Sequence, residues 1–205
     1  MSEDRELLRR WRAGDEVAGT ELVSRNVPVL YRFFRNKVST SLADLVQKTF
    51  VAGVEKRDRI PSDVAFKTYL LGIARKELLM FYRSAGYERR LFEGGHVSAA
   101  EPGEALSDIM ADNEQQRLLL RALRTLPTDL QIVIELFYWE DLPIAEVAQV
   151  VEIPRGTVKT RLHRARGLLR DRIAELDSNA DLRRSTIDNL DRWAHSLRRA
   201  MGRVS

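Results

Sequence analysis

The 205-residue sequence contains no cysteine, and its only three histidines, His96, His163 and His195, stand far apart. The lack of cysteine excludes disulfide bridges, thiolate metal sites and a cysteine nucleophile. The histidines have neither the spacing of metal ligands nor an identifiable nucleophile partner. The glycine pair Gly94–Gly95 lacks the strand and the spacing that a phosphate-binding loop needs. We therefore expect a protein that is not an enzyme and that has no metal or other cofactor.

The sequence also has no apolar run at its start, which reads MSEDRELLRRWRAGDE. A signal peptide or a membrane anchor needs an apolar core segment, so neither is expected there. Hydrophobic residues make up 44% of the chain, which is enough for real cores, and Lys plus Arg exceed Asp plus Glu by only 34 to 30. We expect a soluble, cytoplasmic protein without membrane insertion.

Glycine and proline are scarce, with 11 and 6 residues, and apolar residues recur three and four positions apart along both halves of the chain. This is the helical period and not the alternation of strands, so the sequence predicts an all-α fold. A kink or break is expected near Pro28, inside the second helix. The predicted helices span residues 3–13, 16–38, 41–56, 64–85, 115–125, 127–138, 143–151 and 156–176.

The two halves are separated by a stretch with six acidic residues and no Lys or Arg, residues 91–116. It includes the cluster EGGHVSAAEPGEA, whose composition is typical of a flexible linker. The sequence therefore predicts two helical domains. We place them at residues 1–90 and 115–176, with an acidic linker at 91–114 and a C-terminal helical extension at 177–205.

The stretch IPRGTVKTRLHRARGLLR, residues 153–170, is strongly basic. From Arg155 to Arg172 there are seven Lys or Arg residues, and Asp171 is the one acid that opposes them. On a helix that turns about 100° per residue, an apolar stripe separates from a polar face. The stripe contains Val158, Leu162, Ala165 and Leu169, and the opposite face contains Lys159, Thr160, His163 and Arg164.

The preceding stretch, LPIAEVAQVVEIPRG, predicts a shorter helix whose Ile144, Val147, Ala148 and Val151 can pack on that stripe. A tight connection at residues 152–154 completes the layout of a helix-turn-helix, whose second helix enters the major groove of DNA. Lys and Arg can donate to guanine, and a threonine can approach a thymine methyl group or a phosphate. Residues expected at the DNA backbone are Arg155, Thr157, Arg161 and Arg166. The alternative is a solvated basic face on a structural helix.

These residues resemble a known family. PRGTVKTRLHRAR, preceded by LRTLPTDLQIVIELFYWEDLPIAEVAQVV, resembles sigma domain 4, the minus-35-binding domain of the extracytoplasmic-function (ECF) group of the sigma-70 family. In the first half, RAGDEVAGTELVSRNVPVLYRFFRNKV, DLVQKTFVAGVEK and FKTYLLGIARKELLMFYR resemble sigma domain 2. The resemblance covers residues 7–176.

The resemblance implies a sigma factor that directs promoter-specific transcription initiation. The partners that the resemblance implies are core RNA polymerase, through the beta-prime clamp and the beta flap, promoter DNA and an anti-sigma factor. The residues implied for polymerase binding are Asp44, Leu45, Gln47 and Phe50. Those implied for minus-10 DNA are Arg57 and Arg59 in the base-receiving loop 56–63, and Lys67, Tyr69, Arg75, Lys76 and Arg83 along the next helix. Those implied for reading minus-35 DNA are Lys159, Thr160, His163 and Arg164.

Aromatic and acidic residues carry further expectations. Phe66, Leu70, Ile73 and Phe81 are expected in the core, and Tyr82 and Tyr87 are candidates for stacking on unpaired bases. Glu135 and Glu140 are interpreted as ordinary helix-surface residues. The chain departs from the family pattern with Gly19 in place of an aromatic residue, Lys48 in place of an acid, and Lys76 and Met80 in place of Asn and Asp.

Several alternatives stay open. The linker is either a nucleic-acid mimic for a polymerase channel or a simple tether. The extension spaces Ile187, Leu190, Ala194, Leu197 and Met201 in a stripe, joined by Trp193. It either docks on the protein's own domains, where it would restrain the factor, or binds a regulator. Rival functions are a stand-alone DNA-binding regulator that reads a palindrome as a dimer, and an interaction protein that sequesters a partner.

Overall fold

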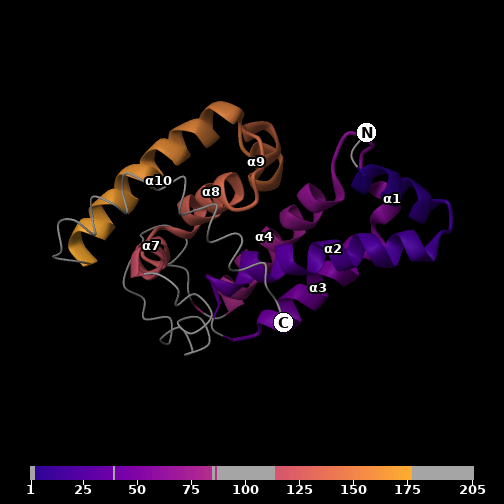
Figure 1. Ribbon diagram of the computed structural model, residues 1–205, viewed down its shortest axis with the longest axis horizontal. Coiled ribbons are helices and arrows are strands. Elements are labelled where there is room, and N and C mark those ends of the chain that lie inside the picture. The colour runs from indigo at the N-terminus through magenta and orange to yellow at the C-terminus, as the bar shows by residue number, and fades with distance from the viewer. Residues whose placement is uncertain (1–2, 39, 85, 87–113, 177–205) are drawn as a thin grey trace.

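The computed structural model describes residues 3–38, 40–84, 86 and 114–176, and all regular secondary structure in these ranges is helical. The N-terminal module contains α1 (Glu3–Arg12), α2 (Glu16–Arg35), α3 (Leu42–Glu55), the 3-10 helix η1 (Arg57–Arg59) and α4 (Phe66–Ser84). The C-terminal module contains α7 (Glu114–Arg124), α8 (Thr128–Tyr138), α9 (Ile144–Val151) and α10 (Arg155–Leu176). The predicted all-α fold is therefore confirmed (Figure 1).

The helix boundaries agree with the sequence to within one or two residues, except that α2 ends at Arg35 and not at residue 38. Its start is fixed by Asp15, whose Oδ1 accepts a hydrogen bond of 3.1 Å from the backbone N–H of Ala18. Pro28 lies inside α2 without ending it, so the helix is not broken there.

Trp11 of α1 explains the unusual glycine of α2. A Cβ atom built on Gly19 would lie 2.3 Å from Nε1 of Trp11, which is far inside van der Waals contact. Trp11 is buried against this glycine and meets the ring of Phe66 edge to face, with the ring centroids 5.9 Å apart. The indole therefore fills the space that the expected aromatic residue at position 19 would occupy.

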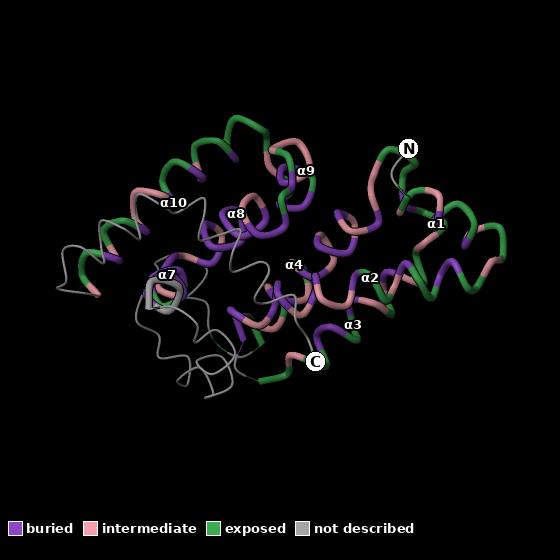
Figure 2. The backbone as a smooth tube through the Cα atoms, in the orientation of Figure 1, coloured by how far each residue is buried: buried purple, intermediate pink, exposed green. Residues whose placement is uncertain are grey.

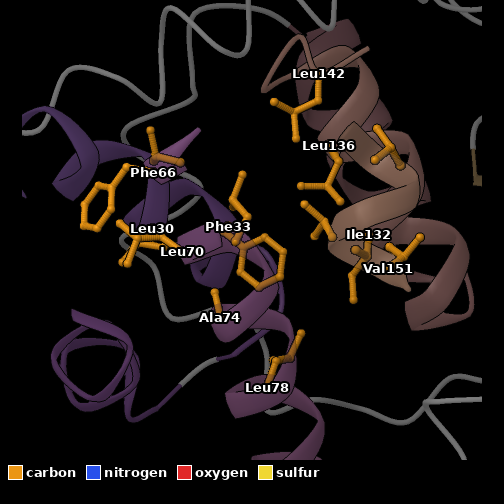
Figure 3. Packing of buried hydrophobic residues seen from close by; sticks show 14 of the residues in the cluster. Leu30, Phe33, Phe66, Leu70, Ala74, Leu78, Ile132, Leu136, Leu142 and Val151 are labelled. Atoms are coloured by element: carbon orange, nitrogen blue, oxygen red, sulfur yellow. The ribbon is translucent and has the colours of Figure 1, made fainter. Parts of the chain in front are cut away.

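The two modules share one hydrophobic core. Buried side chains of α2 and α4, among them Phe33, Leu70 and Ala74, belong to the same cluster as Leu136 of α8 and Val151 of α9 (Figure 3). A second cluster joins α7, α8 and α10. Because α8 contributes to both clusters it is buried nearly all round, as a helix at the centre of a packed assembly must be. The C-terminal module is therefore seated directly on the N-terminal module.

The apolar stripe predicted on α10 points inward. Val158, Leu162, Ala165 and Leu169 are each at most 3% exposed, while the outer face of the helix is open to solvent (Figure 2). No helix in the described ranges is long and apolar enough to cross a membrane. The expectations for Tyr87, the acidic linker and the C-terminal extension fall outside the described residues.

Candidate nucleic-acid and partner interfaces

The predicted helix-turn-helix is formed by α9, a three-residue turn and α10. Glu152, the first residue of the turn, adopts the left-handed conformation with φ of 56°. This reverses the chain and lets the backbone N–H of Ile153 donate to the carbonyl of Ala148. The turn brings the stripe of α10 onto α9, where Val147 and Val151 are buried in the cluster that also contains Val158 and Leu162.

The face of α10 that was expected to read DNA is exposed. Lys159, Thr160, His163 and Arg164 all lie on it, and the hydroxyl of Thr160 donates to the carbonyl of Gly156 over 3.2 Å. Arg155 and Thr157 are exposed at the start of the same helix. These side chains form one cationic surface that no described residue covers, and its donors are of the kind that can contact bases in a groove.

Two other side chains that were predicted to contact DNA, Arg166 and Arg161, are paired with residues of the C-terminal module itself. Arg166 donates from Nε to the hydroxyl of Tyr138 over 2.7 Å, with its guanidinium 5.4 Å from the centre of that ring. Arg161 pairs with Asp129 at 3.5 Å and is half-buried. Both residues help to fix α10 on α8, so a phosphate would have to compete with these contacts.

Of the predicted polymerase-binding residues on α3, Asp44 and Gln47 are exposed, whereas Leu45 is buried in the core and Phe50 packs against it. Lys48, the departure from the family pattern, lies 2.8 Å from Asp44 one turn away. The hydrogen bond to Asp44, helped by its charge, raises the pKa of Lys48. The outer surface of α3 is thus a mixed-charge surface beside the exposed Val51.

Three of the five predicted minus-10 residues on α4 contact the C-terminal module. Lys67 Nζ lies 2.9 Å from Oε2 of Glu140 and donates to the backbone carbonyl of the same residue over 2.7 Å. Lys76 and Arg75 lie 2.7 and 3.6 Å from the carboxylate of Glu152. Three of the cations predicted to line separated DNA strands therefore have carboxylate partners in α8–α10. The remaining predicted residues differ: Arg59 and Arg83 are exposed, while Arg57 and Tyr69 are partly buried.

Glu135 and Glu140 are not surface residues, which corrects the sequence interpretation. They are 3% and 4% exposed and carry the contacts between the modules. Glu135 accepts from Asn36 over 3.0 Å and pairs with the buried ammonium of Lys37. Glu140 accepts two hydrogen bonds from Arg32, at 2.8 and 3.0 Å.

The charge state of Glu140 follows from this setting. Burial alone would raise the pKa of its carboxyl group, but the Arg32 hydrogen bond together with the charges of Lys67 and Arg32 outweighs burial and holds the pKa below its ordinary value. At Glu152 the hydrogen bond from Lys76 has the same effect on a more exposed group. Both carboxylates are ionised at neutral pH and act as anions toward the N-terminal module.

A sequence signal for these acids exists in the stretch DLQIVIELFYW. Gln131 and Glu135 stand four residues apart on one side of a helix that is otherwise apolar, and such a pair is hard to solvate there. In the structure Gln131 donates to Glu135 over 2.9 Å. The signal indicates a buried polar patch, although it does not identify the partners on α2.

The aromatic expectations had a mixed outcome. Tyr82 is 1% exposed and donates its hydroxyl to the carbonyl of Lys37 over 2.8 Å, so the prediction that it stacks on bases is wrong. Phe66 and Leu70 lie in the core as expected. Phe81 is partly buried and packs against the core, and Ile73 is also partly buried.

Fold and surfaces together define an all-helical protein whose helix-turn-helix module is docked on a second helical bundle. The family model described as Sigma-70 region 2 matches residues 22–87, and the one described as Sigma-70, region 4 matches residues 116–169. These matches cover more than half of the chain. The chain belongs to the ECF group of the sigma-70 family of transcription initiation factors.

Curated relatives are similar over most of their length. The chain is 29% identical to the ECF RNA polymerase sigma-E factors of Escherichia coli K12 and Salmonella typhimurium LT2 over 182 residues, which is 84% of this chain and 95% of each relative. The protein of the same name from Haemophilus influenzae is 28% identical over 183 residues, covering 84% of this chain and 96% of the relative.

Two solved structures share the fold. CnrH, in complex with the cytosolic domain of CnrY, superposes with a TM-score of 0.63 at 24% identity and covers 86% of this chain and 100% of that chain. The sigma factor RpoE from Bartonella quintana, in complex with the anti-sigma factor NepR, gives a TM-score of 0.60 at 22% identity and covers 77% of this chain and 97% of that chain.

Proposed function

We propose that the chain binds core RNA polymerase and directs promoter-specific initiation by recognising minus-10 and minus-35 DNA. The observation that carries this proposal is the exposed cationic face of α10, which lies within the residues that match sigma-70 region 4. The opposite face of the helix is the buried apolar stripe, so the cationic face points to solvent. Residues 1–90 would bind the polymerase clamp and the minus-10 element, 115–176 would bind the minus-35 element and the beta flap, and 91–114 would connect them. The site of action would be the cytoplasm, where polymerase and promoters are.

In this function the minus-10 element would be read by α4 and by the loop of residues 56–63. Unpairing the strands costs stacking energy, which a protein can offset by holding bases in pockets and by cation contacts along the backbone. Lys67, Arg75 and Lys76 would provide such contacts. Because carboxylates of the C-terminal module hold all three, we propose that the modules separate before α4 binds the strand.

The energy for this separation would come from the polymerase. The modules are joined by a shared core and by buried ion pairs, so opening costs free energy that a single DNA contact cannot offset. Two separate docking surfaces on a larger body would supply it, since each adds binding energy that only the open chain can use. An anti-sigma partner that favours the closed chain would oppose the change, and the complex of the Bartonella quintana sigma factor RpoE with the anti-sigma factor NepR supports including such a partner.

The test is run-off transcription with purified core polymerase on a template library randomised around the minus-35 and minus-10 positions. Transcripts that start at a fixed distance from two enriched elements would support the proposal. Specific DNA binding without RNA would support the rival DNA-binding regulator instead. Neither RNA nor specific DNA binding would leave the rival sequestering protein.

A further inference from the structure

The loop of residues 56–63 is held by arginines from a helix distant in sequence. The guanidinium of Arg12, at the end of α1, donates from Nε and Nη2 to the carbonyl of Arg57 at 2.9 and 2.5 Å, and from Nη2 to the carbonyl of Ile60 at 2.6 Å. Arg5, two turns earlier, donates to the carbonyl of Asp63 over 2.9 Å. Two arginines of α1 thus donate hydrogen bonds to three carbonyl groups of the loop.

The carbonyls that Arg12 holds lie at both ends of the 3-10 turn. Within the loop, the N–H of Ile60 bonds the carbonyl of Arg57 over 3.4 Å, which is long for a turn hydrogen bond. The planar guanidinium group of Arg12 supplements this weak closure with shorter, charge-assisted hydrogen bonds. The N–H of Arg59 also bonds to the carbonyl of Lys56 over 2.9 Å, so Arg12 adds to the loop's own hydrogen bonds by holding the carbonyls of Arg57 and Ile60.

Trp11, next to Arg12 on α1, contacts the side chain of Arg57 in the loop. The guanidinium of Arg57 lies 5.3 Å from the centre of the Trp11 ring and donates to the carbonyl of Val54 at 3.4 Å. Its Nε is buried and has no hydrogen-bond partner among the described residues. The orientation of Arg57 is consequently set by the face of Trp11, while Arg59, Pro61 and Ser62 of the same loop remain exposed.

We propose that α1 is a positioning element for base selection, and that Arg12 is its positioning residue. By fixing the carbonyls of Arg57 and Ile60, Arg12 sets the shape of the loop that would receive an unpaired base of the minus-10 element. Arg12 acts through the loop and does not itself touch the base. The inference rests on the proposed function, and it assigns specificity at one DNA position to a helix outside the region 2 match, which begins at residue 22.

The experiment is the library transcription assay with core polymerase, run on full chains that carry Arg12→Gln or Arg12→Lys. Gln removes the charged fork, and Lys keeps the charge but can hold only one carbonyl well. The matched control is Arg9→Gln on the same helix, because Arg9 is exposed and pairs with Glu6 only, among the described residues. Thermal unfolding and the affinity for core polymerase are measured for every chain.

We expect Arg12→Gln to lower the preference for the selected base at one minus-10 position about five- to tenfold, the effect of losing roughly one hydrogen bond's free energy. The minus-35 profile should stay unchanged, Arg12→Lys should be intermediate, and Arg9→Gln should match the wild type. A uniform drop in RNA yield with an unaltered base profile would overturn the inference, since Arg12 would then only stabilise the fold. A wild-type chain that enriches no template would instead refute the proposed function itself.

Discussion

Arg32 of α2 and Glu140, just beyond α8, form a bidentate ion pair between the modules, with N–O distances of 2.8 and 3.0 Å. Both side chains are at least nine-tenths buried, and Lys67 of α4 shares the same carboxylate. Burying charges is costly unless every group is paired, so this cluster is favourable only while the modules are in register. The ion pair therefore fixes how one module docks on the other.

Removing the shared acid should loosen the docking. In Glu140→Gln the side chain keeps its shape, but Arg32 and Lys67 lose the carboxylate that they share, so the free energy of unfolding should fall by about 3–5 kcal/mol. Urea denaturation measures the change. The control is Glu175→Gln, an exposed acid that pairs only with Arg172 among the described residues, and it should stay within about 0.5 kcal/mol of wild type. Equal losses in both variants would contradict the role of Glu140.

The contribution of Glu140 should depend on pH. Its pKa in the folded chain lies below the ordinary value of 4.5, so the unfolded chain binds the proton more readily. The stabilisation is therefore complete above pH 4.5 and is lost as the pH falls through the lower folded-state pKa. The difference in unfolding free energy between wild type and Glu140→Gln should be largest at pH 7 and should shrink below pH 4.5. A difference that grows on acidification would be incompatible with this assignment.

The proposed role of the exposed face of α10 in recognising DNA can be tested without disturbing the fold. Replacing Lys159 and Arg164 by Ala removes exposed donors without touching the buried stripe, and if they read DNA as proposed each substitution should cost about 1–3 kcal/mol of discrimination at minus-35 positions. Affinity for core polymerase should stay intact. Arg170→Ala removes one positive charge, as each of the two substitutions does, from an exposed position farther along the same helix and serves as the control. Unaltered promoter choice in the double variant would show that the face is wrongly assigned.

The contact between Trp11 and Gly19 predicts an unusual glycine effect. Ala at position 19 would force a methyl group into the indole, so Gly19→Ala should lower the free energy of unfolding by about 1–3 kcal/mol. Gly72→Ala is the matched control, because nothing lies within 4 Å of a Cβ atom there, and it should be neutral or stabilising by up to about 1 kcal/mol. Urea midpoints distinguish the two, and an equally stable Gly19→Ala chain would rule out the packing explanation.

Much of the fold could be predicted because the apolar residues of an amphipathic helix recur three and four positions apart in the sequence. The stripe of Val158 and Leu162 and the opposed face with Lys159 and His163 follow from local spacing, and both are as expected. Most helix ends were also predictable, since capping residues and prolines act within a turn of their own position, but the end of α2 at Arg35 was not.

The docking of the modules could not be predicted, because its determinants lie far apart in sequence. Arg32 and Glu140 are 108 positions apart, and no local rule pairs them. An acid near the end of a helix is most often exposed, which is why Glu140 was interpreted as a surface residue. The need for glycine at position 19 could not be predicted either, because it arises from contact with Trp11 on another helix.

The central claim is that the closed chain must open to direct transcription, and locking it closed tests this most directly. The side chains of Lys76 and Glu152 meet at 2.7 Å and are 58% and 56% exposed. The natural sequence has no cysteine, so cysteines placed at these two positions would be the sole targets of a short bismaleimide with a reducible disulfide.

The measurement is promoter-specific run-off RNA made with core polymerase before cross-linking, after it, and after reductive cleavage, with the two single-cysteine chains as controls. We expect the cross-linked chain to lose specific transcription and the cleaved chain to recover it. Full specific transcription by the cross-linked chain would contradict the claim that the modules separate.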